Sequence, residues 1–140
     1  MVDRERVLAK LDEMRGYVGE LRSIAPATYE EYKRIATKRA CERLLQIAVE
    51  CVIDVCQLLV SGLRLGLPAE EDDLFDKLEN AALFMPETVK TLRKMRGCRN
   101  ILVHEYGQVS DEIVFATIRT SLDDFDAFAG AVLEALPRNV

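Results

Sequence analysis

Residues 44–60 read LLQIAVECVIDVCQLLV, and this stretch decides the fold because it is apolar on nearly every side of a helix. Four polar residues interrupt it and form one narrow stripe: Gln46, Glu50, Asp54 and Gln57. A helix this apolar is stable in water only when other helices or a partner subunit cover it. We therefore expect a central helix that runs from about Thr28 to Leu63, with a break around Thr37.

The segments before and after this stretch are predicted to form the helices that cover the central helix. Residues 3–24 place apolar side chains at alternating steps of four and three, which is typical of an amphipathic helix. Shorter helices are predicted to begin near Glu70 and at Pro86, because acidic residues complement a helix N-terminus and proline suits a first turn. A last helix is expected from Ser110 to Pro137. No segment alternates with the period of a strand, so the sequence predicts an all-α, up-and-down bundle of four to five helices.

Length and composition indicate a globular protein with one domain. The 140 residues are 49% hydrophobic and 31% charged, and we expect residues 1–140 to share a single core. The start, MVDRERVLAK, is charged where a secretory signal is apolar, so we expect a cytoplasmic protein without a membrane span. The cysteines, at positions 41, 51, 56 and 98, match neither zinc-ligand nor redox spacing. The sequence therefore indicates no metal and no cofactor.

A second stretch, RNILVHEY at residues 99–106, contains the only histidine and raises the question of function. Arg99 continues the apolar line of Leu92, Met95 and Leu102, so its guanidinium is predicted to face inward. At about 100° per residue, four side chains of the stretch fall within an arc of roughly 160°: Arg99, Asn100, His104 and Tyr106. One helix face can therefore present all four together.

An inward guanidinium is unfavourable unless a partner or a wet interface compensates it. Glu50 and Asp54, one turn apart on the central helix, are candidate supporting carboxylates if their stripe faces this helix. The alternative is that the stripe faces solvent, and spacing alone leaves both open.

Arginine, asparagine, histidine and tyrosine in one patch suit chemistry on phosphate esters. Arginine can hold a phosphoryl group by two hydrogen bonds, and histidine can exchange a proton near neutral pH. RNA supplies its own nucleophile, the 2′-hydroxyl, so such a pair could cleave it without a metal and leave a 2′,3′-cyclic phosphate and a 5′-hydroxyl. The competing interpretation is that His104 and Tyr106 only finish a helix, where a histidine is favoured by the C-terminal dipole. Spacing alone favours that simpler interpretation.

The motif and the central helix together resemble a known family. RNILVHEY fits the R-x4-H-x-Y motif of the HEPN superfamily, and ERLLQIAVECVIDV, residues 42–55, looks like the central helix of its HepT-like toxin branch. The order and length of the predicted helices agree over nearly the whole chain. With this resemblance, a functional role for His104 and Tyr106 is clearly favoured over the interpretation that they only finish a helix.

The resemblance implies a metal-independent endoribonuclease that acts as the toxin of a toxin–antitoxin pair. Such toxins are helical homodimers in which the motifs of both subunits meet in a composite cleft. Arg99 would then bind the scissile phosphate, His104 would act as acid or base, and Asn100 would orient the site or contact RNA. The substrate, with transfer RNA among the candidates, is not readable from the sequence.

The resemblance also implies an antitoxin, a minimal nucleotidyltransferase that adds AMP units from ATP to the motif tyrosine, here Tyr106. Four basic residues ahead of the motif are candidates for steering RNA to the cleft: Lys90, Arg93, Lys94 and Arg96. An exposed charged helix face is the commoner explanation for such residues. The alternative function is a catalytically silent helical module that binds a nucleotide or a nucleotidyltransferase partner.

Overall fold

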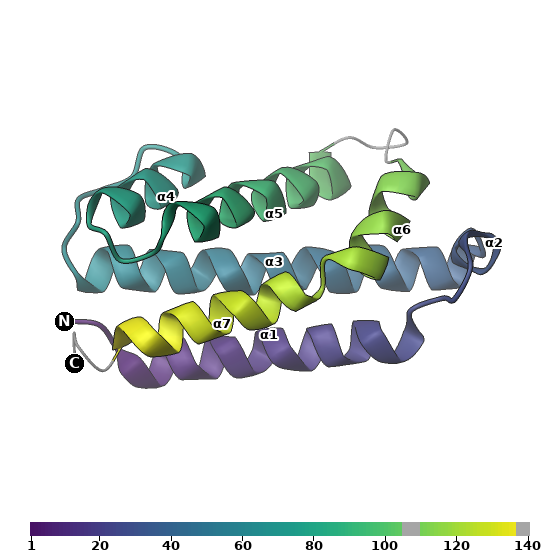
Figure 1. Cartoon of the computed structure of the whole chain (residues 1–140), viewed down its shortest axis with the longest axis horizontal. Coiled ribbons are helices and arrows are strands. Elements are labelled where there is room, and N and C mark those ends of the chain that lie inside the picture. Colours follow the sequence, from purple (N-terminus) through teal and green to yellow (C-terminus); the bar gives the residue numbers. More distant parts are fainter. Residues whose placement is uncertain (105–109, 137–140) are drawn as a thin grey trace.

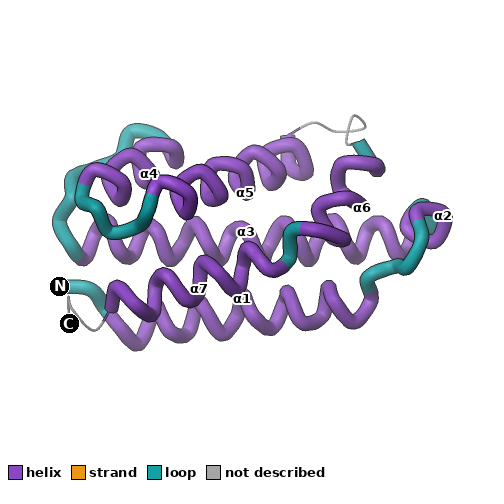
Figure 2. Tube along the Cα trace, viewed as in Figure 1, coloured by secondary structure: helices purple, strands orange, loops and turns teal. Residues whose placement is uncertain are grey.

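The computed structural model describes residues 1–104 and 110–136, and in these ranges all regular structure is helical (Figures 1 and 2). The helices are α1 (Arg4–Ile24), α2 (Tyr29–Tyr32), α3 (Ile35–Gly62), α4 (Glu71–Asn80), α5 (Pro86–His104), α6 (Asp111–Thr120) and α7 (Asp123–Ala135). The predicted all-α bundle is confirmed. The described part has seven helices rather than four to five, because two of the predicted helices are each divided.

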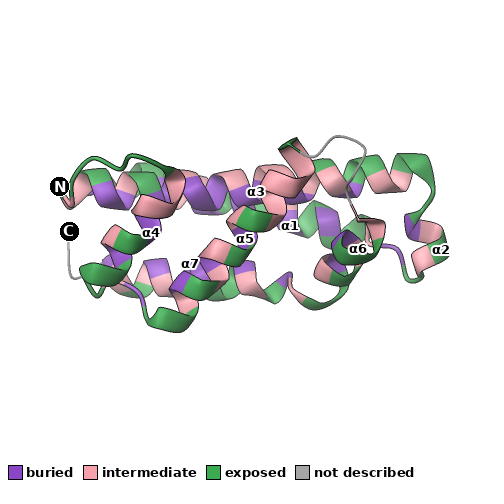
Figure 3. Ribbon diagram, turned by 90° about the horizontal axis from the view of Figure 1, so that it is seen from above, coloured by how far each residue is buried: buried purple, intermediate pink, exposed green. Residues whose placement is uncertain are grey.

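The central helix is α3. It runs antiparallel to α1, while α4 and α5 lie along another of its sides (Figure 1). In residues 44–60 most residues are buried, and Figure 3 colours buried residues purple along α3. Gln57 is the one residue of this stretch that is exposed. By length and hydropathy α3 could also cross a membrane, but more than half of its most apolar window is buried inside the bundle. The helix is thus covered by its own chain, as a core helix must be.

The first helix follows its predicted pattern. The residues of its apolar stripe are all buried: Val7, Leu11, Met14, Val18 and Leu21. The carboxylate of Asp3 accepts a hydrogen bond from the backbone N–H of Arg6 at 3.2 Å and caps the N-terminus of α1. The helix ends at Ile24, two residues before Pro26.

The break ahead of α3 lies earlier than predicted. As the Thr28–Glu31 spacing suggests, the backbone N–H of Glu31 donates to the Thr28 hydroxyl at 3.2 Å and starts α2. This helix lasts one turn, and α3 begins at Ile35, so the chain bends at residues 33–34 and not around Thr37. The bend allows Tyr32 to be buried against Phe115 of α6, with 5.8 Å between ring centroids.

The predicted last helix is also divided, at residues 121–122. The hydroxyls of Thr117 and Thr120 donate to the carbonyls of Ile113, at 2.9 Å, and Ala116, at 2.7 Å, and such bonds weaken a helix. The Ser121 carbonyl then accepts from the Asp124 N–H at 3.1 Å as α7 begins. The apolar line of α6 and α7 is nevertheless buried on both sides of the break: Val114, Ile118, Leu122, Phe125, Ala129, Val132 and Leu136.

The start of α4 is held in place by a carboxylate of its own first turn. Asp73 accepts the backbone N–H groups of Ala69, at 2.8 Å, and Glu70, at 3.0 Å. Leu74 and Leu78 of this helix are buried. The helix ends at Asn80, and Ala82, which follows it, is exposed.

Two helical glycines give a matched test of the packing. A Cβ at Gly62 would lie 2.6 Å from the backbone Cα of Val2, whereas a Cβ at exposed Gly16 would meet nothing within 4 Å. We expect Gly62→Ala to lower the free energy of unfolding by about 1–3 kcal/mol through overpacking. Gly16→Ala should raise it by about 1 kcal/mol through helix propensity. Urea denaturation of both variants measures the difference, and equal shifts would contradict the close approach of the N-terminal segment to α3.

Candidate active site on α5

The motif arginine lies on the inward side of α5. The apolar line ahead of it is buried in the bundle: Val89, Leu92 and Met95. Arg99 follows on the same side, and only 12% of its side-chain surface is exposed. The inward position that the spacing predicts is therefore the observed one, and the guanidinium requires partners.

The partners of Arg99 come from α4 and from its own helix. Its Nη2 donates to Oε1 of Glu71, and its Nε donates to Oδ1 of Asn100 at 3.0 Å. Charge-assisted hydrogen bonds of this kind compensate the hydration that a guanidinium loses on burial. Glu71 is the residue that sequence reasoning missed. The only sign of Glu71 in the sequence was its place among the acidic residues that predict a helix start near Glu70.

Glu50 and Asp54, expected as candidate carboxylates for Arg99, lie elsewhere, and that expectation was wrong. Glu50 accepts from the side-chain amide of Gln46 at 3.0 Å, and Asp54 pairs with Lys10 of α1 at 3.3 Å. Asp54 is turned toward α1 because of the rotation of α3 in the bundle. The helix beside α5 is instead α4, which supplies the carboxylate.

Three arginines of α5 face three carboxylates of α4, and we call these six residues the charge ladder: Arg93, Arg96, Arg99, Glu71, Asp72 and Asp76. Arg96 donates to Glu71 at 3.1 Å and lies 3.4 Å from Asp72. Arg93 lies 3.4 Å from the other Asp72 oxygen and also pairs with Asp76. The arginines of α5 and the carboxylates of α4 thus form one interface.

The charge ladder changes how the basic residues of α5 can act. Arg93 and Arg96 have their charge compensated by α4. Lys90 and Lys94 are exposed, and neither forms an ion pair within the described residues. Of the four basic residues singled out, these two keep a charge that a nucleic acid could reach.

The other motif residues extend from Arg99 to the end of α5. Asn100 is half-buried beside Arg99, and His104, the last residue of the helix, is exposed to solvent. The structure therefore brings Arg99 and Asn100 into contact and leaves the imidazole accessible. Tyr106 lies outside the described residues.

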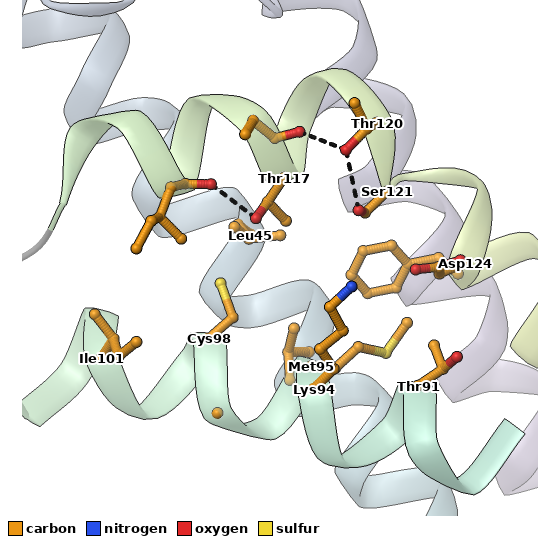
Figure 4. Close-up of a pocket in the computed structure, with 15 residues that line it drawn as sticks. Leu45, Thr91, Lys94, Met95, Cys98, Ile101, Thr117, Thr120, Ser121 and Asp124 are labelled. Atoms are coloured by element: carbon orange, nitrogen blue, oxygen red, sulfur yellow. Dashed lines mark hydrogen bonds between the residues drawn. The ribbon is translucent and has the colours of Figure 1, made fainter. Parts of the chain in front are cut away.

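A groove opens beside α5, between this helix and α6 and α7, with a volume of about 530 Å³. In Figure 4, Met95, Cys98 and Ile101 of α5 extend toward α6, with Leu45 of α3 behind them. Its lining is mostly apolar, and burial raises the pKa of the Cys98 thiol, which keeps that side chain neutral. Sequence reasoning did not predict the groove, because it depends on how far α6 stands from α5.

The four cysteines are free thiols. Cys41, Cys51 and Cys56 are buried, as small core residues should be, and burial raises the pKa of Cys51 to about 11. Within residues 1–104 and 110–136, no three histidine, cysteine or acidic side chains gather as a metal site.

The Asp54–Lys10 pair gives a test of the corrected pairing. The side chains of Lys10 and Asp54 are 35% and 43% exposed, and ion pairs so close to the surface contribute little. We expect Asp54→Asn to change the free energy of unfolding by less than about 1 kcal/mol. A loss of several kcal/mol in urea denaturation would indicate instead that Asp54 compensates a buried charge.

Comparison with known proteins identifies the relatives of this chain. The model of the family described as ribonuclease HepT-like matches residues 14–132. The chain is 32% identical over 88 residues to the mRNA nuclease HepT of Shewanella oneidensis, and the match spans 63% of this chain and 66% of that protein. It is 26% identical over 120 residues to the tRNA nuclease HepT of Aphanizomenon flos-aquae, covering 85% of this chain and 82% of that one.

Solved structures show the same fold. The tri-AMPylated HEPN toxin of Shewanella oneidensis, in complex with an MNT antitoxin, superposes with a TM-score of 0.86 at 23% identity, over 96% of this chain and 99% of that one. The cytosolic protein YutE of Bacillus subtilis, whose function is unknown, superposes with a TM-score of 0.84 at 17% identity, over 99% of this chain and 94% of that one. The family match extends over most of the helical bundle and over the described part of the motif, and on that evidence the chain belongs to the ribonuclease HepT-like family.

Proposed function

We propose that this protein is a metal-independent endoribonuclease, a single HEPN domain of residues 1–140 that acts in the cytoplasm as the toxin of a toxin–antitoxin pair. The observation that carries the proposal is the nearly buried Arg99, held by Asn100 and Glu71 and followed on the same helix by exposed His104. A bundle stabilised by packing alone has no need of a guanidinium on its inward line. The nuclease names of two HepT relatives support the same activity.

The proposed reaction uses groups that the site and the substrate already contain. The 2′-hydroxyl oxygen of RNA attacks the adjacent phosphorus, and the bond from phosphorus to the 5′-oxygen breaks. A proton leaves the 2′-hydroxyl and a proton reaches the 5′-oxygen, so the products are a 2′,3′-cyclic phosphate and a 5′-hydroxyl. His104 moves one of these protons, and Arg99 stabilises the negative charge that grows on the phosphoryl oxygens.

The active form in this proposal is a homodimer with a composite site. The apolar groove beside α5 supports it, because a single chain leaves this surface uncovered and the groove reaches Ile101, one turn before His104. Ile113, at its α6 edge, is 57% exposed. A second copy seated there would cover apolar surface and bring a second motif toward the first.

The antitoxin in this proposal is a minimal nucleotidyltransferase that adds AMP to Tyr106. Support comes from the Shewanella HEPN toxin, which is tri-AMPylated and bound to an MNT antitoxin. Tyr106 follows His104 by two residues. Added phosphates there would compete with RNA for Arg99 and inactivate the site. Lys90, which is exposed and lies outside the groove, would help to attract RNA.

Cleavage of total and transfer RNA in EDTA tests the activity. We expect the parent protein to cleave and to leave cyclic-phosphate ends. His104→Ala should lose about 10²–10⁴-fold in rate through lost proton transfer. Arg99→Ala should lose about 10²–10³-fold through lost charge stabilisation.

Arg15→Ala, which removes an exposed arginine of α1, is the matched control and should keep the parent rate. Parent and variants are first shown to fold and associate equally. An inactive parent, or equal cleavage by all variants, would contradict the catalytic roles of Arg99 and His104. Either result would favour the catalytically silent binding module.

Sedimentation velocity tests the dimer. We expect the parent to sediment at about twice the mass of the chain, and Ile113→Lys to dissociate it and to reduce cleavage, because a charge would enter an apolar interface. Ile35→Lys is the matched control, since Ile35 is 65% exposed but lies outside the groove. A monomeric parent that cleaves RNA would contradict the composite site.

A further inference from the structure

The carboxylate of Glu71 occupies a special position in the charge ladder. Its Oε1 accepts from Nη2 of Arg99 and also from Nε of Arg96, at 3.1 Å for the second bond. The side chain is 31% exposed, and it comes from the first residue of α4, whose turn is fixed by Asp73. One oxygen atom on a rigid turn therefore joins the motif arginine to its neighbour one turn earlier.

The bonds that Arg99 makes fall on one edge of its guanidinium. A guanidinium has five N–H donors in a fixed planar fork. Nε donates to Asn100 and Nη2 donates to Glu71, and these two nitrogens form the side edge of the fork. Among the described residues, Arg99 has no other hydrogen-bond or ion-pair partner. In residues 1–104 and 110–136 no group bonds to Nη1, which with Nη2 forms the end edge, the pair of nitrogens that a phosphate can bind in a bidentate manner.

We propose that Glu71 is the positioning residue of the active site. It holds the side edge of Arg99 so that the end edge faces the scissile phosphate. This inference rests on the proposed ribonuclease function and adds to it a residue outside the R-x4-H-x-Y motif. Glu71 contacts neither RNA nor the reacting atoms and acts only through the guanidinium.

The charge arrangement agrees with positioning. Glu71 is shared between two arginines, but Arg96 also lies 3.4 Å from Asp72, so the charges of the ladder balance. The attraction for phosphate therefore depends on the remaining N–H donors of Arg99 and not on a net positive charge. Asp76, by contrast, pairs with Arg93 at a more exposed part of the charge ladder and does not contact Arg99. Glu71 and Asp76 thus carry the same charge on the same helix, but only Glu71 contacts Arg99. They form a matched pair for mutation.

Steady-state cleavage kinetics separate positioning from simple stabilisation of the α4–α5 interface. We expect Glu71→Ala to lower kcat by about 10–100-fold, because a misplaced catalytic group costs about that much. KM should stay the same or fall, since a negative charge near the RNA is lost. Glu71→Gln, which keeps an oxygen acceptor, should recover part of kcat. Asp76→Asn removes the same charge from the same helix and should leave kcat close to that of the parent.

A second measurement does not depend on activity. In ¹⁵N-labelled protein, the Nε–H resonance of Arg99 is assigned by its loss in Arg99→Lys, and its heteronuclear NOE reports the order of the guanidinium. We expect this order to fall in Glu71→Ala and to persist in Asp76→Asn.

The outcomes are distinguishable. Unchanged order or unchanged kcat in Glu71→Ala overturns the positioning role, and so does an equal loss of kcat in Asp76→Asn. Loss of order in Glu71→Ala, in a parent that cleaves no RNA, supports the placement of Arg99 by Glu71 and overturns the proposed ribonuclease function.

Discussion

The structure depends on the need to cover α3 on nearly all sides. Its residues 44–60 leave only a narrow polar stripe, so the chain must surround it with α1, α4 and α5. This requirement places α4 against α5, because both pack on α3 and a short connection joins them. The site is a consequence of this arrangement, since the carboxylates of α4 meet the arginines of α5 where the two helices touch.

Arg99 stands at the boundary between this core and the site. A fully buried guanidinium would be too costly and a fully exposed one would be poorly oriented. Its side chain is nearly covered, and its side edge is bonded to Glu71 and Asn100. The same bonds that make burial tolerable also fix the direction of the remaining N–H groups. The bonds of Arg99 to Glu71 and Asn100 therefore both stabilise the fold and orient the guanidinium for the proposed chemistry.

The helical periodicity of the sequence indicated well which residues are buried, but it did not indicate where the helices break. The apolar line from Val114 to Leu136 follows helical spacing and is buried on both sides of residues 121–122, although the single helix expected there is divided. At the break the backbone N–H groups of Asp124 and Phe125 donate to the carbonyls of Ser121 and Leu122, a local turn that no apolar pattern records. The early bend before α3 likewise accompanies the packing of Tyr32 on Phe115, two residues far apart in the sequence.

The amino-acid sequence by itself determined the all-α class, the central helix, the inward position of Arg99 and the motif that places the chain in its family. These follow from local spacing, because helical geometry converts sequence intervals directly into faces. Only the tertiary structure decided which carboxylate meets Arg99. Glu50, Asp54 and Glu71 are equally acidic in the sequence, and the choice depends on the rotation of α3 and the docking of α4, which the packing of the whole bundle sets.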